Sequence, residues 1–339
     1  MSGDAERKQR QQNAAREWQD SPMHRPDHNK TRFGFVGALG EQYGAQLAAR
    51  YPRVEAVPAV EGDFPALVVW DLDVAATIRA IEQQPSLTWV HLRWAGVPAP
   101  VIEALRDRQA VLTNGSGAHG LAVAEYVTMV VLAHYKGFSE MHAAQQRSEW
   151  LPDFKLRELR GSTVGILGLG DLGLNVARVL RAFGVRLRGL RRSAEACPEV
   201  DELYQPAALA AFLDGLDVLV AAAPLTAETH GLIGGAELAR LRPGALLVNV
   251  GRAAVVRQEA MLEALRQGQL GGAALDVFVE EPLPAESPLW RMPGVFISPH
   301  CCDASPQSLE RGLELFLDNV GRFLDGQPLR NVVDRATGY

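Results

Sequence analysis

The fold of this chain is decided by the stretch Thr163-Val164-Gly165-Ile166-Leu167-Gly168-Leu169-Gly170-Asp171-Leu172-Gly173. Its first five residues form an apolar run of strand length, which leads directly into the spacing Gly-x-Gly-x-x-Gly. A segment with one apolar face follows, and Gly184 stands where a helix would end. A strand, a glycine loop and a helix in this order are typical of a unit that binds a dinucleotide.

Each glycine of this loop has a physical task in such a unit. Gly168 permits the tight turn, Gly170 lets the backbone approach a pyrophosphate, and Gly173 allows the helix to pack closely on the strand. The free amides at the start of the helix then face the phosphates. The cofactor-binding residues predicted in the loop are Gly168, Gly170, Asp171, Leu172 and Gly173. The alternative is a glycine-rich turn in an α/β protein that binds nothing.

The residues around the loop predict a parallel α/β sheet. Amphipathic segments of helix length separate most of the short apolar runs, which implies right-handed βαβ units. The nearly continuous apolar character of these runs fits a sheet that helices cover on both faces. The predicted strands of this block are residues 163–167, 185–190, 216–221, 245–249, 273–276 and 295–298.

The N-terminal half repeats the alternation without a glycine-rich phosphate loop. A long Ala-rich run predicts a buried helix over residues 122–134 that continues as a polar helix to about Trp150. A last amphipathic helix is predicted over residues 305–324. Residues 1–30 contain no Leu, Ile, Val, Phe or Tyr, so we expect a disordered tail and no signal peptide there. The predicted strands of this half are residues 32–36, 66–70, 87–92 and 111–114.

Length and composition exclude several classes of protein. A chain of 339 residues suggests two domains. The balance of 34 Lys+Arg against 40 Asp+Glu gives a net charge of −6, which disfavours nucleic-acid binding through bulk charge. The three cysteines, Cys197, Cys301 and Cys302, form no CxxC motif, so neither a disulfide scaffold nor a metal site is indicated. No apolar run has the length of a membrane span, and we expect a cytoplasmic protein.

The end of the predicted strand 185–190 bears on the choice of dinucleotide. A carboxylate at this position would bind the ribose hydroxyls of NAD. This chain has Arg191, Arg192 and Ser193 there instead, and the two guanidinium groups suit a 2′-phosphate. We therefore predict NADP(H) as the preferred cofactor and NAD(H) as a usable one. The alternative is a pair of solvated arginines with a loose choice of cofactor.

Three polar side chains each follow one of the last three predicted strands, where ligands of open α/β sheets bind. They are Arg252, Glu281 and His300. Together they suit hydride transfer to a keto group, because a histidine can donate the proton and a neighbouring carboxylate favours its protonated form. An arginine can hold a substrate carboxylate through two parallel hydrogen bonds. Taken singly, each residue has a structural explanation: a solvated charge, a loop carboxylate and a core histidine.

From about Arg32 to Tyr339 the chain resembles the D-isomer-specific 2-hydroxyacid dehydrogenase family. The segment from 281 to 292, which includes Ser287-Pro288-Leu289-Trp290, is most similar to glyoxylate/hydroxypyruvate reductases within that family. The resemblance implies two doubly wound parallel-sheet domains, a Rossmann cofactor domain and a flavodoxin-like, discontinuous substrate domain. It rests on residues 164–173, 224–226, 229–233, 249–252, 273–278, 281–284 and 298–300, which stand in the family's order.

The resemblance also implies roles for individual residues. Arg252, Glu281 and His300 would form the catalytic set, with His300 as the proton donor in reduction and Arg252 as a substrate-binding residue. Asp276 falls where the family contacts the carboxamide of the nicotinamide. Further contacts of the cofactor would come from the backbone at Ala223 and Val250.

The loop that begins at Trp94 resembles the one whose backbone amides hold the substrate carboxylate. Ala95 and Gly96 are the substrate-binding residues predicted there. The roles of Trp94 and His119 stay open, because each residue suits either the lining of the substrate pocket or ordinary packing.

The resemblance implies a division of the chain and a homodimer. The expected parts are a tail over 1–30, a substrate domain over 31–135 and 305–339, and an NAD(P)-binding domain over 136–304. The predicted function is hydride transfer between a nicotinamide cofactor and a small 2-keto or 2-hydroxy acid, D-specific and of glyoxylate or hydroxypyruvate type. Two alternatives stay open: a dinucleotide-binding regulatory protein with little turnover, and a related dehydrogenase that acts on another small acid.

Two positions depart from the family's pattern. Small residues ending in Gly usually follow the catalytic histidine, and this chain has Cys301, Cys302 and Asp303 there. Pro98 stands where an acidic residue is common after the substrate loop. We expect the two cysteines to form a reduced, buried pair, and Asp303 either to crowd the nicotinamide or to place a negative charge near His300.

Overall fold

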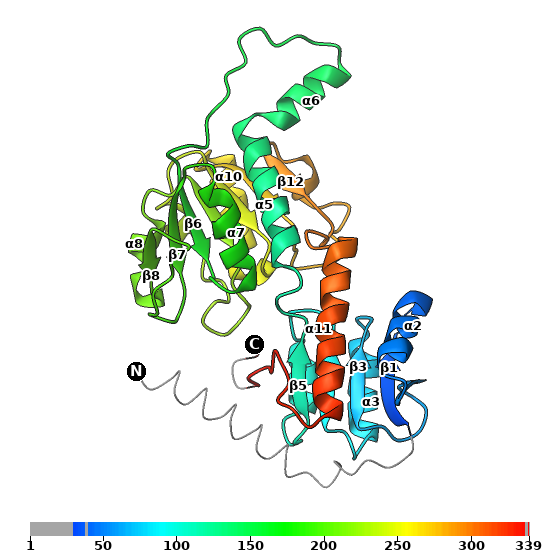
Figure 1. The fold of residues 1–339 in the computed structure, drawn as a ribbon. Coiled ribbons are helices and arrows are strands. Elements are labelled where there is room, and N and C mark those ends of the chain that lie inside the picture. Colours follow the sequence, from blue (N-terminus) through cyan, green and yellow to red (C-terminus); the bar gives the residue numbers. More distant parts are fainter. Residues whose placement is uncertain (1–29, 38–39, 336–337, 339) are drawn as a thin grey trace. The chain divides into compact units, whose positions relative to one another are not determined.

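The computed structural model describes residues 30–37, 40–335 and 338, which divide into two compact units. The first unit combines the described residues up to Ala118 with those from Leu309 onward, and the second runs from His119 to Ser308. Each unit contains one parallel sheet (Figure 1). The predicted tail lies outside the described residues, apart from Lys30.

The first unit has a five-stranded sheet in the order β2-β1-β3-β4-β5, with every neighbouring pair parallel. This is the flavodoxin-like order, which confirms that part of the predicted fold class. The strands are β1 (Thr31–Val36), β2 (Val54–Pro58), β3 (Ala66–Val69), β4 (Trp89–Leu92) and β5 (Val111–Asn114). The helices are α2 (Gly40–Arg50), α3 (Val74–Gln83), α4 (Ala99–Ala104) and most of α11 (Pro306–Leu324).

Helices cover both faces of this sheet because apolar side chains project from both. On one face, Leu67 and Val90 belong to a core that includes residues of α3 and α4. On the other face, Phe33 and Trp89 pack against Phe316 of α11 and against α2. The core of the first unit therefore joins residues from both ends of the sequence.

The buried imidazole of His91, on β4, depends on staying neutral. The indole Nε1 of Trp89 donates to Oγ1 of Thr113 at 2.9 Å, so that hydroxyl can give its own proton to Nδ1 of His91, also 2.9 Å away. This second hydrogen bond needs an unprotonated ring nitrogen. Burial lowers the pKa of His91 from its ordinary value of 6.5 to about 3.

We expect the free energy of unfolding to fall as the pH drops below 6.5. The unfolded chain then binds a proton at His91 that the folded chain does not bind, which removes about 1.4 kcal/mol per pH unit until about pH 3. The variant His91→Gln should lose this share of the pH dependence. Urea unfolding at pH 7 and pH 5 measures it in both proteins. Identical pH slopes would contradict the prediction, since His134, whose pKa burial lowers to about 4, contributes equally to both.

The second unit has a seven-stranded parallel sheet in the order β12-β11-β10-β9-β6-β7-β8. The chain starts at β6, runs outward to β8 and crosses back to β9, so the strand order reverses between β6 and β9. This is the doubly wound Rossmann arrangement, and the predicted fold class is confirmed. The strands are β6 (Thr163–Leu167), β7 (Arg186–Leu190), β8 (Glu202–Tyr204), β9 (Val218–Ala221), β10 (Ala245–Asn249), β11 (Leu270–Leu275) and β12 (Val295–Ile297).

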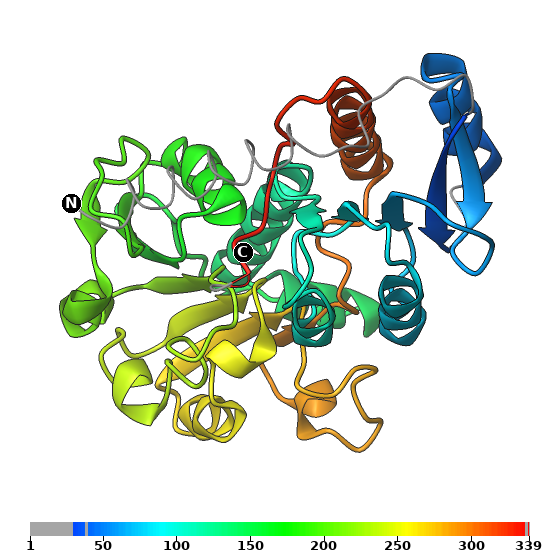
Figure 2. The same cartoon turned by 90° about the horizontal axis from the view of Figure 1, so that it is seen from below.

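Two groups of helices enclose this sheet (Figure 2). One face packs against α5 (Gly120–Tyr135) and α7 (Asp171–Arg181). The other packs against α8 (Leu209–Leu213), α9 (Gly235–Leu238) and α10 (Gln258–Arg266). No helix in the described part of the chain has the length and apolar character needed to cross a bilayer.

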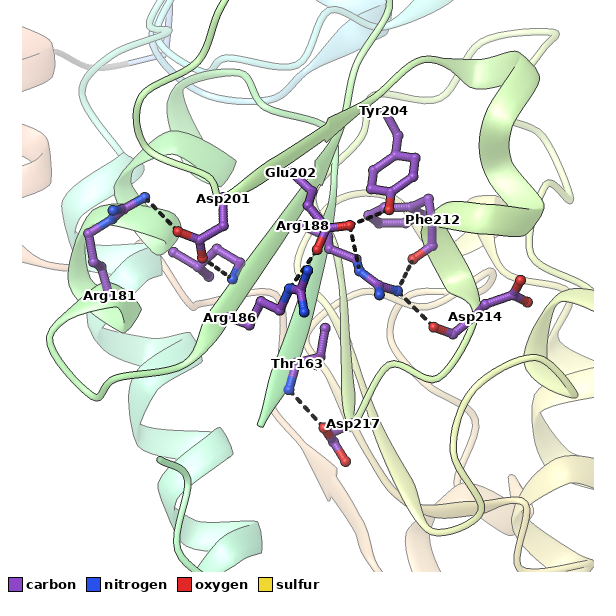
Figure 3. A network of polar contacts seen from close by, with 11 residues as sticks. Thr163, Arg181, Arg186, Arg188, Asp201, Glu202, Tyr204, Phe212, Asp214 and Asp217 are labelled. Atoms are coloured by element: carbon purple, nitrogen blue, oxygen red, sulfur yellow. Dashed lines mark hydrogen bonds and ion pairs between the residues drawn. The ribbon is translucent and has the colours of Figure 1, made fainter. Parts of the chain in front are cut away.

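Ion pairs connect the edge strand β8 to β7, the strand that Arg191 directly follows (Figure 3). Glu202, on the edge strand β8, contacts Nε of Arg186 at 2.6 Å and Nε of Arg188 at 3.4 Å, both on β7. Arg188 also donates to the carbonyl of Asp214 at 2.7 Å. The hydrogen bond from Tyr204 is the largest cause that lowers the pKa of Glu202. The edge strand is therefore held by side chains as well as by its short backbone ladder.

Several local predictions are wrong. The helix predicted to run on to Trp150 stops at Tyr135, because Gly137 adopts a left-handed φ of 58°, and α6 (Phe138–Gln146) then begins. The strands β2 and β8 were not predicted, since β2 is half exposed and β8 is short and polar. The unit boundary lies after Ala118 instead of residue 135, because α5 shares a core with α7.

Candidate active site

The glycine loop has the geometry that close approach of a ligand requires. Gly168 has a φ of 96°, and a Cβ there would lie 2.7 Å from the backbone of Ala223. A Cβ on Gly173 would lie 2.0 Å from the carbonyl oxygen of Gly168, so helix α7 packs directly on the turn. At Gly170 a Cβ would meet open space. The loop therefore leaves its middle glycine accessible beside the start of α7, which fits the pyrophosphate of a dinucleotide.

The side chain of Asp171 is engaged within the protein. Its Oδ2 accepts from the amide of Gly120 at 3.0 Å, and its Oδ1 accepts from Nδ2 of Asn175 at 3.0 Å. Leu172 packs against the core under α5 and α7. Any contribution of these two residues to a cofactor would therefore come from their backbone amides.

The turn after β7 presents the three residues predicted for a 2′-phosphate. The guanidinium of Arg191 donates to the carbonyls of Glu195 and Ala196, so it shapes the turn from within. Ser193 accepts from the amide of Glu195 at 3.2 Å. Arg192 and Ser193 are exposed on this turn. The guanidinium of Arg191 is thus directed into the turn and Arg192 is exposed on it, and the binding of a 2′-phosphate here stays a prediction.

The structure brings Glu281 and His300 into contact. Nδ1 of His300 lies 2.8 Å from Oε2 of Glu281, and the other oxygen of Glu281 accepts from the amide of Phe278 at 2.9 Å. His300 has a left-handed φ of 50°, and its amide donates to the carbonyl of Ser298. When Nδ1 donates to Glu281, Nε2 is the nitrogen left for a substrate.

A buried carboxylate anchors the loop that carries this histidine. Asp276 is fully buried, and its Oδ1 accepts from the Ser298 hydroxyl at 2.6 Å and from the amides of Cys301 and Cys302 at 2.9 and 3.2 Å. Its Oδ2 accepts from the amide of Cys302 at 3.2 Å, and because a carboxylate oxygen can accept more than one hydrogen bond, a carboxamide could also donate to it. Because Ser298 donates to Asp276, the hydroxyl of Tyr126 must donate to Ser298, 2.6 Å away. Burial raises the pKa of Tyr126, so it stays a phenol.

Ser298 and Tyr126 are site residues that sequence reasoning missed. Ser298 had a signal, since it is a polar residue directly before the Pro-His pair. Tyr126 had none, because it stands far away in the sequence, on α5.

Arg252 follows β10 through Val250 and Gly251, and its side chain is exposed. Its Nη1 donates to the carbonyl of Gly251 at 2.8 Å. Asn249 shapes this turn, because it accepts from the amide of Gly251 and donates to the carbonyl of Arg252. The structure therefore places Arg252 at the carboxyl end of a strand, and its pairing with a substrate stays a prediction.

The comparisons with known proteins agree with this arrangement. Residues 128–302 match the model of the D-isomer specific 2-hydroxyacid dehydrogenase, NAD binding domain. A glyoxylate/hydroxypyruvate reductase A from Serratia proteamaculans is 39% identical over 216 residues, which cover 63% of this chain and 68% of that protein. The chain belongs to the D-isomer specific 2-hydroxyacid dehydrogenase family. The predicted family is thereby confirmed.

Solved members of the D-isomer specific 2-hydroxyacid dehydrogenase family share the fold. One from Aeromonas salmonicida is 31% identical, with a TM-score of 0.79 over 91% of this chain and all of that one. One from Xanthobacter autotrophicus, solved with NADPH and MES, is 32% identical, with a TM-score of 0.79 over 92% of this chain and all of that one. An NADPH-dependent glyoxylate/hydroxypyruvate reductase from Sinorhizobium meliloti, solved with NADP and sulfate, is 30% identical, again with a TM-score of 0.79 over 92% of this chain and all of that one.

The loop predicted to hold the substrate carboxylate belongs to the first unit. It follows β4, and two hydrogen bonds fix its shape. Nδ2 of Asn114 donates to the carbonyl oxygen of Ala95 at 2.7 Å, and the amide of Gly115 donates to the carbonyl oxygen of Trp94 at 2.9 Å. Ala95 and Gly96 are both partly exposed. The guanidinium of Arg93 lies 5.1 Å from the centre of the Trp94 ring, which gives Trp94 a packing partner.

The two adjacent cysteines are not a buried pair. Cys301 is exposed and Cys302 is partly buried, so the expectation is wrong for Cys301. Burial, reinforced by the charge of Asp276, raises the pKa of the Cys301 thiol above its ordinary value, and the pKa of Cys302 is raised in the same way. Both therefore stay thiols at neutral pH, which disfavours a nucleophilic role.

Proposed function

We propose that this chain is an NADP(H)-dependent reductase that converts a small 2-keto acid of glyoxylate or hydroxypyruvate type into the 2-hydroxy acid. The observation that carries the proposal is the contact between His300 and Glu281, on a loop anchored at Asp276, within the unit that carries the glycine loop. The accessible backbone at Gly170 and the carboxylate of Asp276 both fit a nicotinamide dinucleotide.

The protein's own groups supply binding and the proton. A bound nicotinamide cofactor would supply the hydride for the keto carbon. His300 donates a proton from Nε2 to the carbonyl oxygen, while Glu281 holds the ring by Nδ1. We propose Arg252 as the residue that binds the substrate carboxylate, and the backbone amides at Ala95 and Gly96, in the first unit, as separate candidates for this role. We propose that the reduction gives the D-isomer where the product is chiral, as the family's description implies.

Activity assays that combine NADPH or NADH with each of four 2-keto acids test this function. We expect turnover of glyoxylate or hydroxypyruvate with NADPH, and weaker turnover of pyruvate and phenylpyruvate, followed by absorbance at 340 nm. Tight NADPH binding without turnover of any 2-keto acid would contradict the proposal and favour a dinucleotide-binding regulatory protein. Turnover confined to another small acid would favour a related dehydrogenase.

The cofactor preference is proposed to depend on Arg192. Replacing it with Ala should raise KM for NADPH about tenfold, because one charge-assisted contact with the 2′-phosphate is lost. KM for NADH, which lacks this phosphate, should stay within about twofold. Steady-state kinetics with both cofactors measure the two values. An equal rise in KM for both cofactors would mean that the substitution disturbs the turn and that Arg192 does not contact the 2′-phosphate.

We further propose a homodimer that works in the cytoplasm without a nucleic-acid or membrane partner. An apolar arm supports the dimer: on and after α6, Phe138, Met141 and Leu156 are exposed, and Trp150 is 89% exposed. Large apolar side chains gathered at a surface favour association. Light scattering on the purified chain measures the oligomeric state.

The proposed cytoplasmic location has separate support. Free cysteines suit a reducing compartment, and the net charge of −6 does not favour binding to a polyanion such as a nucleic acid.

A further inference from the structure

The hydroxyl of Tyr126 begins a chain of hydrogen bonds that ends at Asp276. It lies 2.6 Å from Oγ of Ser298, and Ser298 donates to Oδ1 of Asp276, also at 2.6 Å. Ser298 and Asp276 are both buried. The three residues belong to the second unit, where Tyr126 lies on α5 and the other two directly follow β12 and β11. The sheet and one of its covering helices therefore meet at this carboxylate.

The hydrogen bonds of this chain run in one direction. The carboxylate of Asp276 accepts from the amides of Cys301 and Cys302 at the same Oδ1, so it acts there as an acceptor. Ser298 has a single hydroxyl proton, which it gives to Asp276, and its oxygen is left to accept from Tyr126. Burial raises the pKa of Tyr126, and the charge of Asp276 acts in the same direction, so the phenol keeps its proton. Hydrogen bonds joined in this way strengthen one another.

Helix α5 holds Tyr126 in place and also contacts the glycine loop. At the first residue of the helix, the amide of Gly120 donates to Asp171 at 3.0 Å. The ring of Tyr126 packs against the core that α5 shares with α7, and its centre lies 6.4 Å from that of Phe296 on β12. One helix thus touches both the loop that fits a pyrophosphate and the loop that carries His300.

Asp276 depends on such donors because its side chain is completely buried. A carboxylate removed from water is stable only when hydrogen bonds replace those of the solvent. Two of these donors are amides of the His300 loop, and the third is the hydroxyl of Ser298. Of the three, the hydroxyl alone can rotate. A donor on its far side, such as Tyr126, fixes the direction of that rotation.

We propose that Tyr126 is a positioning residue for the nicotinamide end of the cofactor: it directs the Ser298 hydroxyl onto Asp276 and thereby fixes the orientation in which this carboxylate meets the carboxamide. The inference rests on the cofactor contact proposed for Asp276. Tyr126 acts through Ser298, and it touches neither cofactor nor substrate.

The variant Tyr126→Phe removes the hydroxyl and keeps the ring. Calorimetry compares its affinity for NADPH with that for 2′-phospho-ADP-ribose, which has the phosphates and the adenosine but no nicotinamide. We expect Kd for NADPH to rise about 3- to 10-fold, the effect of about one hydrogen bond. Kd for the fragment should stay within about twofold, because the glycine loop and the turn after β7 are untouched.

Tyr135→Phe is the matched control, because it removes the same atom from the same helix. The hydroxyl of Tyr135 donates to Oγ of Ser162 at 3.1 Å, and Ser162 precedes β6, at the opposite edge of the parallel sheet from Ser298. We expect wild-type affinity for both ligands. If Tyr126→Phe weakens NADPH and the fragment equally, or no more than Tyr135→Phe does, the hydroxyl only supports the fold and the inference is overturned.

A double variant tests the route through Ser298. Ser298→Ala should weaken NADPH at least as much as Tyr126→Phe does, and adding Tyr126→Phe to it should change Kd by less than about twofold. Effects that multiply in the double variant would show that Tyr126 acts on its own and would overturn the inference.

These measurements need no substrate, so they separate the inference from the proposed reduction. A chain that shows the expected affinities but reduces no 2-keto acid counts against the proposed function alone. A chain that reduces 2-keto acids, with the same NADPH affinity in Tyr126→Phe as in the wild type, counts against the role of Tyr126 alone.

Discussion

The variant His300→Ala is expected to lower kcat for 2-keto acid reduction by about 10²–10⁴-fold, which is the usual contribution of a general acid. Nε2 is the nitrogen left for the substrate once Nδ1 faces Glu281. Without the imidazole, water must supply the proton from an unfixed position. Stopped-flow measurement of NADPH oxidation at saturating substrate gives the effect on the chemical step.

Two controls accompany this variant. NADPH affinity should stay within about twofold, because the glycine loop and Asp276 are untouched. The pH–rate profile should lose the inflection that a titrating histidine gives. A His300→Ala enzyme with the wild-type profile would show that another group donates the proton.

The variant Arg252→Ala should lower kcat/KM by about 10²–10⁴-fold. Two charge-assisted hydrogen bonds to the substrate carboxylate are lost, and each is worth about 1.5–3 kcal/mol. Arg252→Lys should recover only part of the loss, since an ammonium group cannot make the paired contact. Steady-state kinetics measure both variants.

Arg266→Ala is the control for this second prediction. It removes an exposed arginine of α10 that pairs with Glu263 at 3.6 Å. We expect no change in kcat/KM for this control. Were Arg252→Lys as active as the wild type, a simple charge at this position would suffice and the paired geometry would be wrong.

Three strands could be predicted to the residue, because short apolar runs mark them in the sequence: β5, β6 and β10 begin and end as predicted. The other predicted strands are present with bounds that differ by one to three residues at one or both ends. β8 could not be predicted, since Glu202–Tyr204 has one aliphatic residue and is held by a short backbone ladder and by ion pairs with β7. Its stability comes from partners elsewhere in the chain, which a local pattern does not contain.

The residues of the candidate site also divide into those that the sequence predicts and those that only the structure shows. Strand-end positions alone placed Glu281 and His300 at one edge of a sheet, and the structure shows their contact. The support behind them is not local: Tyr126 reaches Ser298 across 172 positions of sequence. The sequence allows Asp303 a charge near His300, and it allows His119 either a pocket lining or a packing role; in the structure Nδ1 of His119 lies 2.8 Å from Oδ2 of Asp303. Only the folded chain shows that these two residues meet.

The return of helix α11 to the first unit has a consequence for synthesis on the ribosome. Phe33 and Trp89 emerge early, yet Phe316, which covers them, follows only after the 190 residues of the second unit. At translation rates of about 5–20 residues per second, that interval is about 10–40 s. During it, the part of that face which α11 covers in the folded chain stays apolar and exposed, so the nascent chain has a defined window in which a chaperone can protect it from aggregation.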